Sequence, residues 1–288
     1  MSPVRRLVLR PAVLSLLLSS LLLPAGGCKS GANANPILHQ SAKEALSQGK
    51  QLMADKKYSR AREYLQHAFE VEPNSLAGRE GLLLVADSYY LDSGRTNLIQ
   101  AEAKYRDYLN RFPTSDRAAY VQFQIGNSLA QRMGPPDRDL SVSKDALKAY
   151  EDLLRLYPTS EYAAQAREKM RLVRENLADH EYIVGSFYLT YKVPRAAVKR
   201  FDYLLENFPD YSERDKVLYK LGIAQIRGHE NADAKKTFDR LAREYPDSHY
   251  THEIPDVPPP KAAPATAGDG KKGSKGDEVT KSGEEASG

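Results

Sequence analysis

The stretch LYKLGIAQIRGHENADAKKTFDRLAREYP, residues 218–246, carries the pattern from which we assign the fold. Its second half places Ala234, Phe238 and Leu241 at spacings of four and three, and Pro246 follows five residues later. Spacings of three and four put side chains on one face of an α-helix. A proline ends a helix because it has no backbone N–H to donate. We therefore predict two helices joined by a turn, the second of which ends before Pro246.

The same pattern occurs five times along the chain, always with its residues at relative positions 0, 3, 7, 10 and 15. The alanines at position 3 are Ala61, Ala101, Ala146, Ala197 and Ala234. In three repeats a glycine lies twelve residues before the alanine, at Gly49, Gly185 and Gly222. This is the spacing of the tetratricopeptide (TPR) repeat, a helix–turn–helix unit of about 34 residues. The chain is thus predicted to be all-α, a TPR-like solenoid of five helix-turn-helix repeats over residues 41–250.

The prolines that end successive repeats lie 40, 45, 51 and 37 residues apart, which indicates insertions between the helix pairs. An apolar stripe with a spacing of four predicts the first helix of the third repeat: Val121, Ile125, Leu129 and Met133. A proline-containing insertion, 134–139, separates it from a second helix that begins near Ser143. An additional helix is predicted over 160–177, with Ser160 and Glu161 as its N-terminal cap. Another helix is predicted from about 179 to 192.

Residues 1–27 have the features of a bacterial secretory signal peptide. Basic residues precede an apolar run from Ala12 to Leu23, which is too short to span a bilayer comfortably. Small residues then lead to Cys28, the only cysteine of the chain. This resembles a lipoprotein processing site, at which Cys28 would begin the mature chain and carry the acyl groups. An ordinary signal peptide with an incidental cysteine is the alternative. The identity of Lys29, by resemblance to lipoprotein sorting rules, favours the outer membrane.

The segments that flank the repeats are predicted to be irregular. Residues 28–40 are small and polar, as expected of a tether between the membrane and the folded body. Residues 251–288 mix proline and glycine with charged residues and serine, and contain no aromatic residue. A segment of that composition cannot bury enough apolar surface to fold, so we predict a disordered tail.

Composition argues against several classes of function. The formal net charge of +4 falls to about +1 once Arg5, Arg6 and Arg10 are removed with the signal peptide (4 − 3), so no nucleic-acid partner is expected. A single cysteine excludes an internal disulfide and a cysteine-rich metal site. No nucleophile elbow, phosphate-binding loop or dinucleotide motif is present. We therefore predict no enzymatic activity, no cofactor and no metal.

Two local features could carry chemistry and are interpreted as structural. His249 and His252 have the spacing of half a metal site, but no other ligand cluster is near in sequence, so we interpret them as surface histidines. Asp137 and Asp139 could form an acid–base pair, but with Arg138 between them we favour a loop ion pair.

Two stretches go beyond a generic TPR pattern. One begins with Asp-Arg-Asp at 137–139 and leads to Tyr-Pro-Thr-Ser-Glu-Tyr-Ala at 157–163. The other contains Glu-Tyr at 181–182 and Ala-Ala-Val-Lys-Arg-Phe at 196–201. Together with the Cys28 site and the five repeats, they resemble the BamD family of lipoproteins, which belong to the outer-membrane β-barrel assembly (BAM) machinery. The resemblance covers roughly residues 41–250.

The resemblance implies a non-enzymatic scaffold that is lipid-anchored in the outer membrane and faces the periplasm. Such a scaffold would bind a BamA-like outer-membrane barrel protein and help to receive unfolded outer-membrane protein segments, with other assembly lipoproteins as further partners. Arg200 occupies the position of a family arginine that takes part in the BamA contact. The groove of the first repeats, about 41–113, corresponds to the family's proposed site for substrate segments.

The chain departs from the family pattern in two places. Lys192, Val193 and Pro194 stand where the family usually has Gly-Ala-Tyr, and no long closing helix follows Pro246. Because solenoids need a polar cap, we expect a partner or the tail to cover the last repeat.

Two other functions stay open. One is a TPR adaptor lipoprotein of another envelope system, such as cell-wall synthesis or Tol–Pal coordination, although no heptad run of the kind common in such proteins is present. The other is an enzyme on a TPR platform, for which no segment outside the repeats is large enough.

Overall fold

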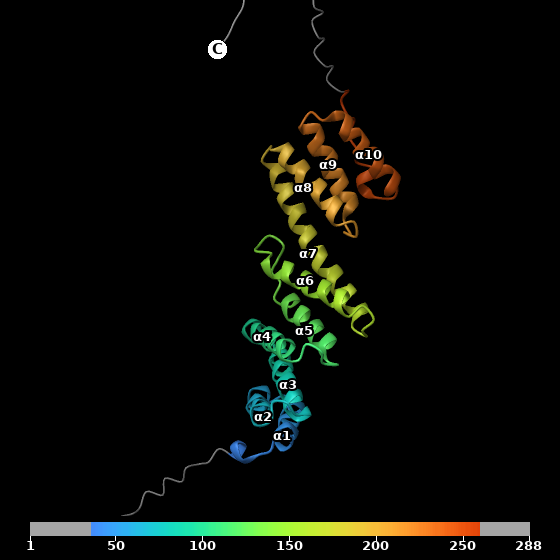
Figure 1. Cartoon of the computed structure of the whole chain (residues 1–288). Coiled ribbons are helices and arrows are strands. Elements are labelled where there is room, and N and C mark those ends of the chain that lie inside the picture. Colours follow the sequence, from blue (N-terminus) through green and yellow to red (C-terminus); the bar gives the residue numbers. More distant parts are fainter. Residues whose placement is uncertain (1–35, 260–288) are drawn as a thin grey trace, which may run out of the picture. The chain divides into compact units, whose positions relative to one another are not determined.

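The computed structural model describes residues 36–259, and in this range every regular element is a helix (Figure 1). The chain divides between Ser93 and Gly94 into two compact units, which we describe separately. The all-α prediction is confirmed for the described residues.

The first unit is a stack of three α-helices preceded by a short 3₁₀ helix. Its elements are η2 (Pro36–His39), α1 (Ala42–Ala54), α2 (Tyr58–Val71) and α3 (Leu76–Asp92). α1 packs on α2, and α3 packs on both. α1 begins at a capping box, in which Ser41 accepts from the Glu44 backbone N–H and the Glu44 carboxylate accepts from the Ser41 N–H.

The second unit contains seven α-helices, each packed against the next along the chain. They are α4 (Arg95–Arg111), α5 (Ala118–Ala130), α6 (Ser141–Leu156), α7 (Ala163–Thr190), α8 (Pro194–Asn207), α9 (Arg214–Arg227) and α10 (Asn231–Glu244), followed by η3 (His249–Thr251). The second helices of the five predicted repeats are α2, α4, α6, α8 and α10. Each of their position-3 alanines is fully buried.

In four repeats the second helix lies against a glycine of the first helix. A β-carbon added at Gly222 would lie 2.4 Å from the Phe238 ring, and one at Gly185 would lie 2.6 Å from the Phe201 ring. Gly49 stands in the same relation to Leu65, at 2.6 Å. In the third repeat, a β-carbon added at Gly126 would lie 2.5 Å from the Tyr150 ring. The glycine therefore admits the large side chain that follows the alanine by one helical turn.

We expect Gly222→Ala to lower the free energy of unfolding by about 1–3 kcal/mol, because the added methyl group overpacks the contact with Phe238. Alanine's better helix propensity, worth about 1 kcal/mol, would give the opposite sign if packing did not dominate. Urea unfolding measures the free energy of unfolding of the single variant and of the double variant Gly222→Ala/Phe238→Leu, in which the smaller leucine relieves the overpacking. A double variant no more stable than the single one would contradict the contact.

The turns between the paired helices contain residues in the left-handed region. Lys56, Lys192 and His229 have φ values of 58°, 61° and 62°, and each lies two residues before the second helix of its repeat. Lys192 is followed by Val193 as the N-cap and by Pro194 at the first position of α8, where a proline is tolerated. The departure at 192–194 thus preserves the turn, with a lysine at a backbone position that favours glycine.

Lys192→Gly is expected to raise the free energy of unfolding by about 0.5–1 kcal/mol, because a non-glycine residue in the left-handed region costs about 1–2 kcal/mol, partly offset by the extra freedom of glycine in the unfolded chain. Lys199→Gly, in the exposed interior of α8, should instead lower it by about 1 kcal/mol. Thermal and urea unfolding of both variants tests whether Lys192 occupies a strained left-handed conformation. Equal losses of stability in the two variants would contradict this.

The prediction of separate helices over 160–177 and 179–192 is wrong, because α7 is one helix of 28 residues. Leu177 and Ala178, at the predicted break, are buried, and neither glycine nor proline interrupts the helix there. The predicted cap is also wrong, since α7 begins at Ala163 after Tyr162 without a side-chain cap. Figure 1 shows α7 as the long yellow helix that extends from α6 to α8 and α9. It completes the packing of the third repeat and forms the first helix of the fourth.

One smaller prediction changes, and the predicted cover of the last repeat stays a prediction. Met133 lies beyond the end of α5, so the stripe on that helix consists of Val121, Ile125 and Leu129, all buried. The last repeat is bounded by a polar outer face of α10, and no large hydrophobic side chain between Asp210 and Pro259 is exposed. Residues after α10 also contact both helices of the last repeat. The Tyr250 ring lies 5.4 Å from the Tyr219 ring of α9, and Asn231 of α10 donates to the Pro259 carbonyl at 3.3 Å.

Candidate functional site

Arg200 projects from α8 and is held by a carboxylate on α7. Its Nη1 donates to Glu181 Oε2 at 3.0 Å. The Arg200 side chain is 44% exposed, whereas that of Glu181 is 12% exposed. Within the described residues, this is the only side-chain bond of Arg200, so its Nε and Nη2 atoms remain available. The pair therefore presents a positioned guanidinium edge that suits a partner's carboxylate.

The same region is fixed by the packing of α7 on α8. Gly185 admits the Phe201 ring, and the Tyr182 ring lies 6.2 Å from it. Lys216 Nζ of α9 lies 4.6 Å from the Tyr182 ring centre. Because Arg200 immediately precedes Phe201, this packing determines the direction in which the Arg200 side chain leaves α8.

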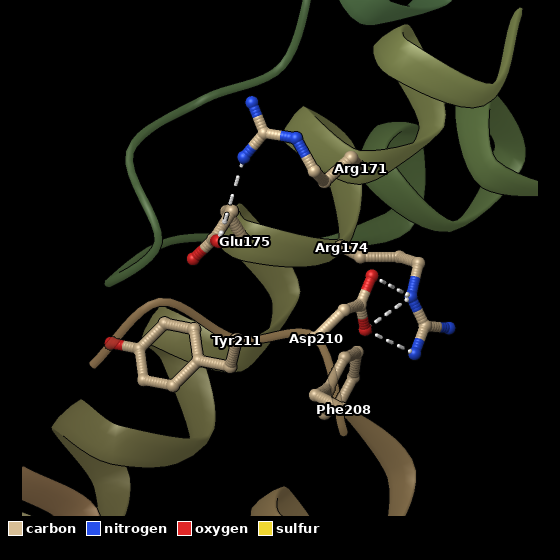
Figure 2. Close-up of a pocket in the computed structure, with 6 residues that line it drawn as sticks. All are labelled: Arg171, Arg174, Glu175, Phe208, Asp210 and Tyr211. Carbon is tan, nitrogen blue, oxygen red and sulfur yellow. Dashed lines mark hydrogen bonds and ion pairs between the residues drawn. The ribbon is translucent and has the colours of Figure 1, made fainter. Parts of the chain in front are cut away.

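A second cluster, shown in Figure 2, fastens the loop between α8 and α9 to α7. Arg174 donates from Nε and Nη2 to the Asp210 carboxylate at 2.9–3.2 Å, and from Nη2 to the Asn207 carbonyl at 2.9 Å. Its guanidinium also lies 5.3 Å from the Phe208 ring centre. This arrangement is specific to arginine, because a lysine has no planar fork to bind both oxygens.

The same loop has two further attachments to α7. The Tyr211 hydroxyl donates to Asp179 at 2.7 Å, and the Ser212 backbone N–H donates to Glu175 at 3.1 Å. Burial, together with the hydrogen bond to Asp179, raises the pKa of Tyr211, so it stays a neutral donor. The space between these side chains is too small to hold a water molecule. We conclude that this cluster is a structural joint that positions α8, and not a ligand site.

Acid should weaken this joint. The hydrogen bond from Arg174 holds the pKa of Asp210 below its ordinary value, so the bond stabilises the fold above the ordinary carboxyl pKa, and this stability is lost as pH falls through the lowered one. Because Asp210 is partly exposed, Asp210→Asn should cost only about 0.5–1 kcal/mol at pH 7. It should also reduce the loss of unfolding free energy between pH 6 and pH 3.

Urea unfolding at both pH values measures this effect. Asp239→Asn is the matched control, since Asp239 only pairs with Lys235 on the same exposed face of α10. An Asp210→Asn variant whose pH dependence equals that of the wild type would contradict the assignment.

The predicted substrate groove, 41–113, includes α1, α2 and α3 of the first unit and α4 of the second unit. In the first unit, Arg62 of α2 donates twice to Asp92 of α3, both at 3.1 Å, and lies 4.3 Å from the Tyr89 ring centre. Two open depressions of about 410 and 320 Å³ lie on this unit, at the start of α1 and at the α1–α2 turn. The first is lined by polar side chains between His39 and Gln48, and the second by residues 56–60 together with Asp92.

The remaining candidates behave as structural residues. Asp139 accepts from the backbone N–H and the hydroxyl of Ser141, and these bonds lower its pKa. It thus binds Ser141, the first residue of α6, and forms no ion pair among the described residues. His249 lies 3.2 Å from Glu253, and His252 is exposed. No group of three or more potential metal ligands occurs among residues 36–259.

Cys28, the signal peptide 1–27, most of the predicted tether and residues 260–288 lie outside the described residues, so the predictions made for them stay predictions. Within the described helices, none combines the length and apolar character needed to cross a bilayer.

Sequence reasoning singled out Arg200 as a partner contact, which stays a prediction, but it did not predict that Glu181 binds this arginine. Glu181 belongs to one of the stretches quoted above, yet its pairing spans 19 residues and two helices. The Arg174–Asp210 contact spans 36 residues. Sequence periodicity does not predict the Arg200–Glu181 pair or the Arg174–Asp210 pair, because each contact depends on the angle at which α7 and α8 cross.

Comparison with known proteins identifies relatives over most of the chain. A family model described as "YfiO: Outer membrane lipoprotein" matches residues 39–232. The chain is 28% identical over 240 residues to "Outer membrane protein assembly factor BamD" of Rickettsia prowazekii, covering 82% of this chain and 94% of the relative. It is 24% identical to the protein of that name in Caulobacter vibrioides, covering 84% and 78%. Among solved structures, the "TPR2AB-domain:pHSP90-complex of yeast Sti1" is similar at a TM-score of 0.37 and 16% identity, covering 74% and 95%.

Proposed function

Because this chain belongs to the YfiO family of outer membrane lipoproteins, we propose that it is a lipid-anchored, non-enzymatic scaffold of outer-membrane protein assembly. The observation that carries the proposal is the extent of the family match, which runs through both compact units. The match also spans nearly the full length of a relative named as an assembly factor, which supports a common role for the whole folded body.

The anchor in this proposal is Cys28. More than one acyl chain on its amino group and sulfur would hold the protein stably at the outer membrane, whereas a single chain binds only marginally. Attachment on the periplasmic side would confine the helical units near the membrane plane and raise their effective concentration beside a membrane partner.

The partner in this proposal is a BamA-like outer-membrane barrel protein, bound through Arg200. The support comes from geometry: the guanidinium is half-exposed, held at 3.0 Å by Glu181, and has two donor atoms to spare. A partner carboxylate could bind these donors without displacing Glu181. Unfolded outer-membrane protein segments would be received by the region 41–113, and other assembly lipoproteins could bind the same scaffold.

The test is a pull-down from detergent-solubilised membranes with the full, natively processed chain. We expect a barrel protein with periplasmic repeat domains to co-purify in stoichiometric amount. Arg200→Gln should weaken its binding about tenfold or more, because glutamine can still bond Glu181 but cannot offer a charged fork. Arg240→Gln is the control, since Arg240 pairs with Glu244 on α10 in a similarly exposed setting.

The outcomes separate the parts of the proposal. Recovery of the barrel protein at equal affinity with both variants would retain the function and discard Arg200 as its contact. Recovery of peptidoglycan-bound or Tol-type proteins in its place would favour an adaptor of another envelope system. Recovery of the chain only in the soluble fraction would contradict the lipid anchor.

A further inference from the structure

The second half of α7 exposes an apolar stripe. Ile183, Phe187 and Tyr191 are spaced by four residues and are 39%, 54% and 66% exposed. On the opposite side of the helix, Gly185 and Leu189 are buried, and Gly185 lies against α8. The Phe187 and Tyr191 rings are 4.4 Å apart between centroids, so they form one continuous aromatic surface. Exposed apolar side chains are common singly, but an ordered stripe on one helix face is not accounted for by packing within this unit.

Between Glu181 and Asp202, the charged residues of the chain are all basic. Residues 182–201 contain four lysines or arginines and no aspartate or glutamate. Arg200 is paired with Glu181. Lys192, Arg195 and Lys199 are exposed, and within the described residues their side chains have no hydrogen-bond or ion-pair partner. The α7–α8 turn and the first half of α8 therefore place three unpaired cationic side chains shortly after the aromatic pair in the sequence.

An aromatic centre with a charged border is the composition of a protein-binding surface. A second copy of this chain would bring like charges together, which disfavours self-association through this face. A lipid surface fits less well, because interfacial helices bury a long apolar face, whereas this stripe extends only from Ile183 to Tyr191, a rise of about 12 Å. Charge complementarity instead favours an acidic partner.

We propose that the outer face of the second half of α7, together with the α7–α8 turn, binds an acidic protein segment that carries apolar side chains. Phe187 and Tyr191 contact the apolar side chains of the segment, and Lys192, Arg195 and Lys199 pair with its carboxylates. The proposal rests on the proposed function only in locating the partner at the cell envelope. The surface is defined by residues other than the Arg200–Glu181 pair.

A photo-crosslinking amino acid, p-benzoylphenylalanine, placed at Phe187 in the full chain tests the proposal in native membranes. Leu156, which is 52% exposed near the end of α6, is the control position. We expect Phe187 to crosslink to one protein, and mass spectrometry to place the crosslink in a segment that carries aspartate or glutamate beside apolar residues. A crosslink to lipid, a crosslink to a second copy, equal yields at both positions or no crosslink would overturn the proposal.

Charge reversal provides the second readout. Lys192→Glu/Lys199→Glu should lower the yield of the Phe187 crosslink roughly tenfold at 0.15 M salt, and less at 0.5 M salt, where screening already weakens the charge pairing. Lys235→Glu/Lys236→Glu on α10 reverses the same number of charges elsewhere and should leave the yield unchanged. An unchanged yield with the first pair would show that the contact does not depend on complementary charge.

The two proposals can fail separately. A crosslink to an acidic segment of a protein outside outer-membrane assembly would retain this surface and contradict the proposed function. Recovery of the barrel protein in the pull-down without a Phe187 crosslink would retain the function and discard this surface.

Discussion

The close approach of paired helices depends on a glycine of the first helix facing a large side chain of the second. Gly126, Gly185 and Gly222 each face an aromatic ring, and Gly49 faces Leu65. Without a β-carbon, the first helix lets the ring lie directly against its backbone, and the alanine one turn earlier in the second helix keeps the two axes close. These four helix pairs therefore share the same kind of close contact, although the intervals between successive repeats differ by up to 14 residues (51 − 37).

The second unit is organised by α7, which belongs to two repeats at once. Its first half closes the third repeat: Asn176 accepts from Ser143 at 2.8 Å and donates to the Gly134 carbonyl at 3.2 Å. Its second half receives Phe201, and residues between the halves hold the α8–α9 loop through Arg174, Glu175 and Asp179. Since a continuous helix transmits position without a flexible connection, the direction of α8 and of Arg200 is set by residues that lie up to 26 positions earlier in the chain (200 − 174).

The length of α7 also accounts for the surface properties of this region. α7 takes part in two repeats, yet Ile183 and Phe187 in its second half and Tyr191 directly after it are left exposed. Nearby, the pair of Arg200 and Glu181 keeps one cation in a defined orientation, while Lys192 of the turn and Arg195 and Lys199 of α8 are exposed. The region thus combines an aromatic surface, one positioned guanidinium and exposed cationic side chains, which together suit the docking of an acidic partner.

The sequence by itself determined the helical class, the core positions of the second helices and the glycines of three first helices, because helical periodicity is a local property that repeats make visible. The role of Arg200 as a partner contact comes from the family resemblance and stays a prediction. The sequence did not determine that the region 160–192 contains one helix, α7, in place of two. The helix continues through Leu177 and Ala178, where these side chains are buried against neighbouring helices. Nor could the sequence pair Arg200 with Glu181 or Arg174 with Asp210. Those contacts, and the exposure of the α7 stripe, follow from the crossing of α7 with α8, which only the tertiary structure decides, because contacts between helices depend on distances that local periodicity does not encode.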